Sequence, residues 1–183
     1  MRLGPVLATC ALVALLGAGC GSDDDPEPVS AATLPDNVCD AVPANVVERW
    51  DLSDGPHRSE QSDDRSEATC VMTSTIDGNE VKLSITLTSF GGSDADAVRA
   101  LVADEVAARC DELKQQGEGR FKAEDTRCSA EADTTVTEIS TAIPAHGVVT
   151  VTMSHRGQMS QLLPAEVVGL SGVVANSEPD ELP

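Results

Sequence analysis

Aromatic residues are scarce in this chain of 183 residues, which contains one tryptophan, two phenylalanines and no tyrosine. Binding sites for sugars and nucleobases usually stack their ligand on aromatic rings. Trp50, Phe90 and Phe121 are isolated from one another in the sequence. The composition therefore argues against a sugar-binding or nucleobase-binding protein.

Basic residues are also few. The 12 lysines and arginines face 31 aspartates and glutamates, so the formal net charge is −19 at pH 7. So acidic a protein repels nucleic acid and anionic lipid head groups, and we expect no nucleic-acid partner. The charge is compatible with solubility, with cation-rich surroundings or with a basic partner, and it does not choose among them.

Recognisable catalytic and cofactor motifs are missing as well. The sequence holds no P-loop, no Rossmann fingerprint and no H-E-x-x-H motif. The stretch Gly169-Leu170-Ser171-Gly172 is not a nucleophile elbow, which needs G-x-S-x-G. We therefore expect no enzymatic activity and no cofactor.

The remaining candidates for chemistry are three histidines and one glutamate. His146 and His155 flank a single predicted strand, which would place them about 30 Å apart at about 3.3 Å per residue, too far to share a site. His57 lies in a polar stretch, and we interpret all three histidines as exposed. Glu138 lies among threonines and has no partner carboxylate to tune its pKa, so we interpret it as an exposed strand residue rather than a general acid.

Long apolar runs are absent too, since Val6–Leu16 is shorter than the roughly 20 residues that cross a bilayer. That length is typical of a signal peptide. The stretch Leu16-Gly17-Ala18-Gly19-Cys20 follows and resembles a bacterial lipobox, in which the cysteine thiol is diacylglycerylated and becomes the mature N-terminus. We therefore predict a signal peptide at residues 1–19 and a lipid anchor on Cys20, at the extracytoplasmic face of the cell membrane.

The sequence leaves two alternatives to this lipid anchor. One is an ordinary secreted protein in which Cys20 is incidental. The other is acylation at Cys10, after Leu7-Ala8-Thr9, but this would leave too short an apolar segment before the cysteine.

The segment after Cys20 is acidic. Ser22–Ser30 holds three aspartates, one glutamate and two prolines, and such a composition cannot bury enough apolar surface to fold. We therefore assign residues 20–36 to a disordered tether, residues 37–176 to a single domain and residues 177–183 to an acidic tail. A domain of this length buries about two-thirds of its unfolded surface, enough for a core.

Four cysteines remain after Cys10 and Cys20. An even number of cysteines in an exported chain implies two disulfides, for which three pairings exist. The chain resembles a loose repeat of helix, hairpin and helix with a cysteine pair in each half, which favours Cys39–Cys70 and Cys110–Cys128. Zinc sites need close pairs such as C-x-x-C, and none occurs here, so we expect no metal.

Hydrophobic periodicity predicts the elements of the domain. Val81, Leu83, Ile85 and Leu87 alternate with polar residues, which indicates a half-buried strand paired with residues 70–76 as a hairpin. We predict helices over 38–50, 93–114 and about 164–176, and strands over about 134–143 and 147–155. We also predict a surface loop at 51–68 and a polar stretch at 115–133 with at most one strand, near 119–131. The helix over 93–114 begins at a capping box of Ser93 and Asp96. The order α-ββ-α-ββ-α predicts an α+β fold, an antiparallel sheet packed against helices.

Four features of the chain together carry a resemblance to a known family. They are the lipobox, the acidic tether, Cys39-Asp40-Ala41-Val42 on the first helix and Cys70 at the start of the hairpin. The chain resembles actinobacterial lipoproteins of a domain-of-unknown-function family. The resemblance implies a membrane protein of the outer face with no catalytic residues to carry over.

We therefore expect a lipoprotein with a non-enzymatic binding or accessory role at the cell envelope. Its partner would be an unidentified protein or a small apolar ligand, held in a pocket between sheet and helices that Val, Leu, Ile and Met would line. The alternatives are an envelope hydrolase whose site is built by loops 51–68 and 115–133, and a structural or immunity-like protein with one protein partner.

Overall fold

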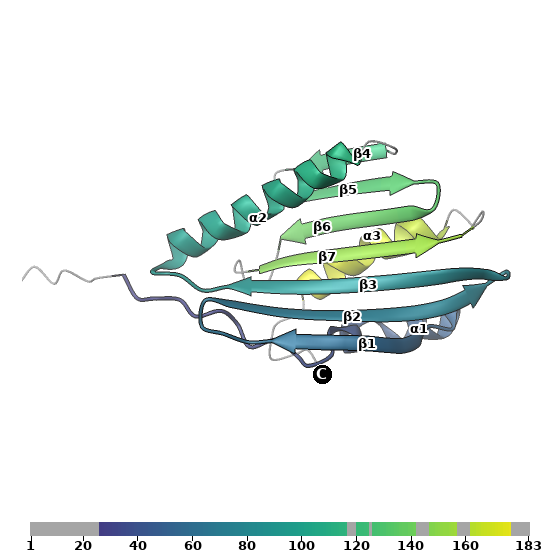
Figure 1. Cartoon of the computed structure of the whole chain (residues 1–183), viewed down its shortest axis with the longest axis horizontal. Coiled ribbons are helices and arrows are strands. Elements are labelled where there is room, and N and C mark those ends of the chain that lie inside the picture. The colour runs from purple at the N-terminus through teal and green to yellow at the C-terminus, as the bar shows by residue number, and fades with distance from the viewer. Residues whose placement is uncertain (1–25, 117–119, 125, 142–146, 157–161, 177–183) are drawn as a thin grey trace, which may run out of the picture.

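A seven-stranded antiparallel sheet packed against helices forms the described part of the protein (Figure 1). The computed structural model describes residues 26–116, 120–124, 126–141, 147–156 and 162–176. Its elements, in chain order, are the 3-10 helix η1 (Val38–Ala41), α1 (Ala44–Trp50), β1 (Ser53–Glu60), β2 (Arg65–Ile76), β3 (Asn79–Phe90), α2 (Ala95–Gln115), β4 (Arg120–Glu124), β5 (Arg127–Ala132), β6 (Thr135–Thr141), β7 (Gly147–His155) and α3 (Leu162–Asn176). The predicted α+β class and antiparallel sheet are confirmed.

Two meanders build the sheet. The strand order is β1-β2-β3-β7-β6-β5-β4, so β1 to β3 form one half and β4 to β7 the other. The halves join where β3 pairs with β7, and α2 carries the chain from β3 to the far edge strand β4 (Figure 1). This order has more strands than the expected α-ββ-α-ββ-α, because β1, β4 and β5 extend the two hairpins.

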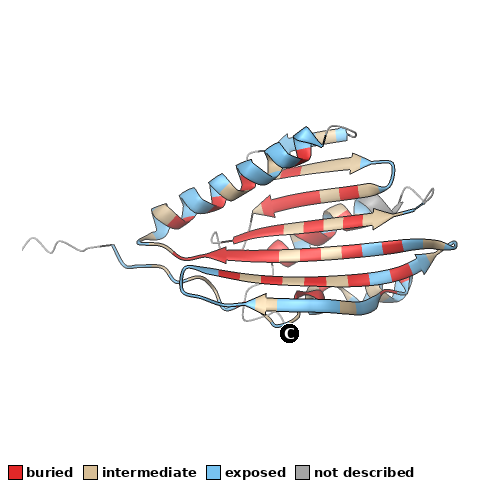
Figure 2. Ribbon diagram, in the orientation of Figure 1, coloured by how far each residue is buried: buried red, intermediate tan, exposed pale blue. Residues whose placement is uncertain are grey.

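Helices cover both faces of the sheet, and each face has its own core (Figures 1 and 2). On one face, η1, α1 and α3 pack over side chains that include Leu83 and Ile85 of β3. On the other, α2 packs over side chains that include Ile139 of β6 and Val148 of β7. We call these the α3 face and the α2 face.

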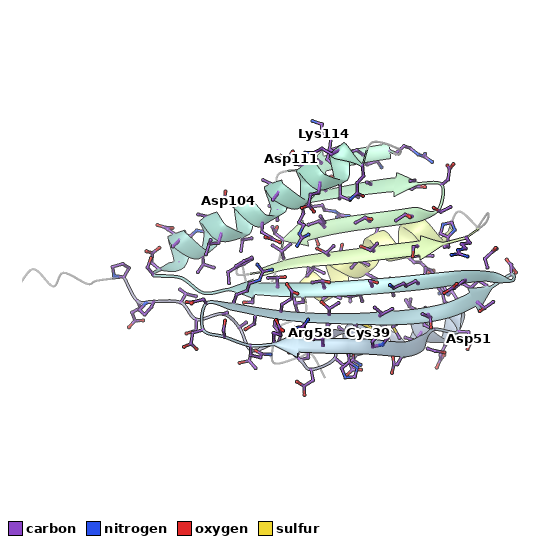
Figure 3. All side chains as sticks on the ribbon, in the orientation of Figure 1. Cys39, Asp51, Arg58, Asp104, Asp111 and Lys114 are labelled. Atoms are coloured by element: carbon purple, nitrogen blue, oxygen red, sulfur yellow. A yellow bond between two sulfur atoms is a disulfide. The ribbon has the colours of Figure 1, made fainter. Side chains whose placement is uncertain are left out.

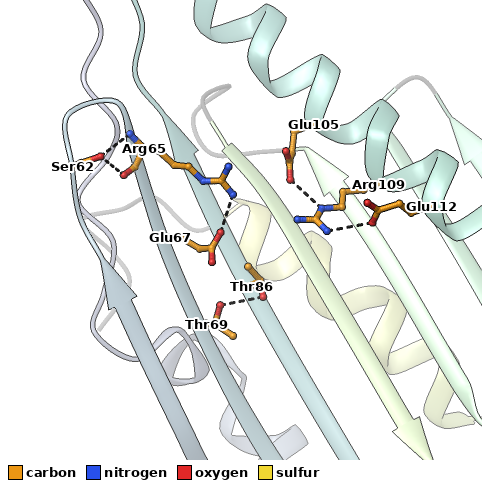
Figure 4. A network of polar contacts seen from close by, with 8 residues as sticks. All are labelled: Ser62, Arg65, Glu67, Thr69, Thr86, Glu105, Arg109 and Glu112. Carbon is orange, nitrogen blue, oxygen red and sulfur yellow. Dashed lines mark hydrogen bonds and ion pairs between the residues drawn. The ribbon is translucent and has the colours of Figure 1, made fainter.

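The alternation along β3 has the predicted orientation. Leu83 and Ile85 are fully buried on the α3 face, while Ser84 and Thr86 point to the α2 face and are only partly buried. Away from α2 this face is polar, and there Thr69 and Thr86 lie 3.3 Å apart through their hydroxyls (Figure 4). A threonine can contribute its methyl group to the sheet surface and its hydroxyl to water, which suits an uncovered β-face.

The helix α2 lies close to its prediction but has a different cap. Asp94, rather than Ser93, is the N-cap residue, and its carboxylate accepts a hydrogen bond from the backbone N–H of Ala97 at 2.8 Å. Leu101 is a large apolar residue of this helix that is 43% exposed. Charged side chains lie along the outer side of the helix (Figure 3); they include Asp104, Asp111 and Lys114.

The first predicted helix is interrupted. Residues 38–50 form η1 and then α1, with extended backbone at Val42 (ψ 124°). Pro43 explains the break, because its ring disfavours helical backbone at the preceding residue and it has no N–H to donate.

The predicted surface loop at 51–68 is wrong. Most of it belongs to β1 and to the first residues of β2, which pair in register from His57 with Cys70 to Glu60 with Glu67. The strand β1 is at the edge of the sheet and most of its residues are exposed, so it lacks the alternation that reveals a half-buried strand. A register shift between Asp54 and His57, around Pro56, is typical of an edge strand.

The folded part begins earlier than predicted. Val29, assigned to the tether, forms a β-bridge with Gly92 through N···O distances of 2.9 and 2.7 Å. Ala31 donates a backbone hydrogen bond to Asp63 at 2.9 Å. Residues 1–25 and 177–183 lie outside the described residues, and with them the signal peptide, Cys20, most of the acidic run and the tail.

Both disulfides of the favoured pairing are present. Cys39–Cys70 joins η1 to β2 within the core of the α3 face. Cys110–Cys128 joins α2 to β5 on the α2 face. One covalent link therefore holds a helix against the sheet on each side.

Candidate functional site

A cavity of about 300 Å³ lies on the α3 face, where β4, β5 and β6 extend beside α3. Five of its lining residues are charged, which differs from the aliphatic pocket expected from the sequence. The lining residues are Arg120, Lys122, Glu124, Arg127, Cys128, Ser129, Ala130, Glu131, Val136 and Val168.

Strand alternation places these side chains. Phe121 of β4 and Cys128 of β5 belong to the core under α2, so their neighbours in sequence point to the opposite face. The polar stretch at 115–133, for which we expected at most one strand, forms two. This pair of short strands carries most of the cavity wall.

The register of β4 and β5 sets opposite charges against each other. Arg120 lies directly across from Glu131, and Glu124 lies across from Arg127. Lys122, between them, lies across from Ser129. The lining therefore has two complementary pairs and one lysine that faces a hydroxyl rather than a carboxylate.

The ion pairs of the lining differ in burial. Arg120 Nη2 lies 3.7 Å from a carboxylate oxygen of Glu131, and both side chains are largely exposed. Arg127 Nη2 lies 2.7 Å from Oε1 of Glu138 on β6, whose side chain is fully buried. The two pairs share no residue, and only the second reaches into the interior.

Glu138 contradicts our interpretation of it as an exposed strand residue, because its exposed fraction is 0%. Burial raises the pKa of its carboxyl above the ordinary value of 4.5, the Ser171 hydroxyl and Arg127 oppose this shift, and Glu124 adds to it. Its surroundings come from two other elements, β5 and α3, which the sequence of β6 does not reveal.

The carboxylate of Glu138 is not hydrogen-bonded within the described residues. The contact with Arg127 has the distance of a hydrogen bond but not its direction. The Ser171 hydroxyl donates instead to the carbonyl of Val168 at 3.2 Å. Buried polar groups are nearly always hydrogen-bonded, so the charge of Arg127, rather than a hydrogen bond, compensates this buried carboxylate.

The residues that line this cavity are suited to binding a ligand. Arg127 lines the cavity and contacts Glu138, whereas Glu138 is not among the described residues that line it. Glu138 therefore acts on the cavity through Arg127. Ser129 offers a hydroxyl, but no histidine accompanies it as a general base among the lining residues that the structure describes.

A second cavity of about 300 Å³ lies at one end of the central strands, where the start of β3, the end of β7 and the start of β6 meet. It is lined by Glu80, Lys82, Thr134, Thr135, Ser154, His155 and Arg156. Its residues come from strand ends and turns, and it is more open to solvent than the first cavity. We therefore take the cavity beside α3 as the candidate site.

The structure does not bring the described histidines together. His57 is exposed on β1, and His155 ends β7. The strands β2 and β3 separate β1 from β7, a distance of at least about 14 Å at 4.8 Å per strand. His146 lies outside the described residues, and the described part holds no cluster of three or more His, Cys, Asp or Glu that could bind a metal ion.

Comparison with known proteins does not identify a family. No protein-family model, no curated protein and no solved structure matches this chain. Among the described residues, no helix is both long enough and apolar enough to cross a membrane.

We did not predict Arg120, Lys122 and Arg127 as functional residues from the sequence. A signal was nevertheless present, because three of the 12 basic residues of a very acidic chain fall within residues 120–127. The alternation of Arg120, Phe121 and Lys122 also fits a strand with one polar face.

Proposed function

We propose that this chain is a lipoprotein, anchored by acyl chains on Cys20 at the extracytoplasmic face of the cell membrane, whose domain binds a small ligand without catalysing a reaction. The observation that carries the binding role is the cavity between β4, β5 and α3. Its volume is at the lower end of the range for ligand pockets, about 300–1,000 Å³.

Two further features support the anchored, extracytoplasmic part of the proposal. The lipobox-like stretch before Cys20 is followed by an acidic segment. Disulfides persist in oxidising compartments, and Cys39–Cys70 and Cys110–Cys128 fit such a location.

The proposal also limits how far the domain stands from the membrane. The folded part begins at Val29, where the chain pairs with Gly92. A fully extended chain from Cys20 to Val29 spans at most about 30 Å, at about 3.3–3.6 Å per residue. The end of the sheet where β3 leads into α2 would therefore be the end nearest the membrane (Figure 1).

An envelope hydrolase is the second candidate, and the buried Glu138 favours it. Carboxyls with a raised pKa cluster at active sites. Binding accounts better for the site, because the residue of the lining that contacts Glu138 is Arg127, a cation that holds ligands rather than a nucleophile or base.

Fractionation of cells that express single-cysteine variants tests the anchor. We expect Cys20→Ala to move the protein from the membrane fraction to the soluble fraction. Cys10→Ala is the matched control and should stay with membranes. Sedimentation of the Cys20→Ala protein with membranes would show that the lipobox interpretation is wrong.

Mass spectrometry of the protein extracted from its own envelope tests the binding role. Under denaturing conditions, the mass should correspond to a chain that begins at an acylated Cys20 and carries two disulfides. Under native conditions, a discrete additional mass would support a bound small ligand. A bare chain would favour a protein partner, which crosslinking in intact cells would then identify.

A further inference from the structure

The charge of the cavity is opposite to that of the protein around it. The chain has a formal charge of −19, yet among the described residues the charged lining consists of three cations and two anions. Chance placement in so acidic a chain would give a mostly negative lining. The local excess of one positive charge is therefore the feature to explain.

Lys122 supplies that excess. Arg120 and Arg127 each lie across from a glutamate in the β4–β5 register, whereas Lys122 lies across from Ser129. Lys122 is exposed and makes no ion pair within the described residues. Its ammonium group and the Ser129 hydroxyl are adjacent donors that no carboxylate of the register opposes.

Arg127 also has hydrogen-bond donors available to a ligand. A guanidinium carries five N–H groups, and the contact with Glu138 does not have hydrogen-bond direction. The side chain of Arg127 is 42% exposed and lines the cavity. Glu138 therefore holds the guanidinium by charge from below while its N–H groups remain free for a ligand.

The remaining wall is apolar. The side chains of Val136 of β6 and Val168 of α3 line the cavity. A ligand that filled the cavity would place its charged end against β4 and β5 and an uncharged body against these side chains. A net lining charge of one suits a monoanion, because a dianion would also meet Glu124 and Glu131.

We propose that this cavity binds a small monocarboxylate, with the carboxylate accepting hydrogen bonds from Lys122, Ser129 and Arg127 and the apolar body packing against Val168. Glu138 is a positioning residue for Arg127. This inference rests on the proposed binding function and narrows it to one ligand class.

Benzoate and benzamide are suitable probes, because they have the same shape and differ in charge. We would measure their binding to the full-length protein in non-ionic detergent by saturation-transfer NMR. Benzoate should bind at least about tenfold more tightly than benzamide, since charge-assisted hydrogen bonds contribute about 1.5–3 kcal/mol and tenfold corresponds to about 1.4 kcal/mol. Inorganic phosphate should compete poorly at a pH where it is a dianion.

Lys122→Gln is the decisive variant, because Lys122 is exposed and its loss should leave the fold intact. It should weaken benzoate binding roughly tenfold and leave any benzamide binding unchanged. Lys82→Gln is the matched control, an exposed strand lysine that lines the other cavity, and it should not change either affinity.

The outcomes separate this inference from the proposed function. Equal binding of benzamide and benzoate, with no effect of Lys122→Gln, would overturn the carboxylate assignment and leave a binding cavity. Equal weakening by both lysine variants would show that net charge, not this site, attracts the anion. Absence of binding by either probe at millimolar concentration would also overturn the assignment, whereas the membrane anchor is tested separately by Cys20→Ala.

Discussion

Arg127 on β5 and Glu138 on β6 form an ion pair across neighbouring strands, with 2.7 Å between Nη2 and Oε1. The glutamate is fully buried, while the arginine side chain is 42% exposed at the cavity. Arg127 and Glu138 are diagonal neighbours in the β5–β6 register, and their contact does not have the direction of a hydrogen bond. The attraction between the two side chains is therefore electrostatic. This ion pair therefore contributes to the stability of the domain and also positions a side chain that lines the cavity.

Glu138→Gln should change how stability depends on pH. Burial raises the folded-state pKa of Glu138 above 4.5, so the folded protein retains this proton to higher pH than the unfolded chain does. Unfolding then releases a proton, and this residue's contribution to stability falls as pH rises from about 4.5 through the folded pKa. In urea unfolding at several pH values, the free energy of unfolding of Glu138→Gln should rise relative to that of the natural protein as pH increases over that window.

Glu48→Gln is the control for this pH effect. Glu48 is exposed on α1 and makes no ion pair within the described residues. Glu48→Gln removes one formal negative charge, as Glu138→Gln does, but at an exposed position. The difference between the pH profiles of the two variants therefore isolates the effect of the buried carboxyl. A Glu138→Gln profile parallel to that of the natural protein would show that the buried carboxyl keeps an ordinary pKa.

Arg127→Gln should destabilise the fold by about 1–3 kcal/mol, because Glu138 remains buried without its cation. The double variant Arg127→Gln/Glu138→Gln should recover most of this loss, since neither side chain is then charged. A double-mutant cycle from urea unfolding at neutral pH measures the coupling. If the two single effects simply add, the pair contributes nothing to stability.

Removal of either disulfide should destabilise the domain. The loops closed by Cys39–Cys70 and Cys110–Cys128 have sequence separations of 31 and 18. On the chain-entropy account, their paired Cys→Ala variants should lose about 4 and about 3 kcal/mol. Guanidinium unfolding of the two double variants provides the comparison, and equal stability with and without a disulfide would contradict the structural role of that bridge.

Gly91→Ala should destabilise the domain and loosen the segment that begins at Val29. A Cβ at Gly91 would lie 2.1 Å from the carbonyl oxygen of Asp63 and 2.9 Å from Val29 O and Ala31 N, all backbone atoms. Such contacts cannot be relieved by turning a side chain. Thermal unfolding and amide hydrogen exchange at Ala31 should report the change.

Gly169→Ala is the matched substitution in open space. No atom lies within 4 Å of a Cβ placed there, and Gly169 is exposed within α3. Alanine should raise stability by up to about 1 kcal/mol through its helix propensity. A destabilised Gly169→Ala protein, or an unaffected Gly91→Ala protein, would contradict the packing described here.

Elements with one apolar and one polar side were predictable from the sequence. The alternation around Leu83 and Ile85 identified β3, and hydrophobic periodicity over residues 93–114 identified α2, in which Val98, Val102 and Val106 are buried. Each of these patterns is strong because one face of the element is buried throughout and the other is not.

Elements without such a contrast were missed. The edge strand β1 is exposed on most of its residues, and β4 has only Phe121 partly buried in the described sheet. Their strand structure comes from pairing with β2 and β5, which is a property of the partner rather than of the local sequence.

The sequence by itself determined the α+β class and the antiparallel hairpins, because hydrophobic period expresses them locally, and it favoured one of three possible cysteine pairings, which the structure contains. Only the tertiary structure decided that Glu138 is buried and that Arg120, Lys122 and Arg127 line one cavity. Burial depends on what lies across a strand and above it, here Arg127 on β5 and Ser171 on α3. The local sequence around a charged strand residue is the same whether water or a helix covers its side chain. Long-range packing therefore determines whether that side chain is buried.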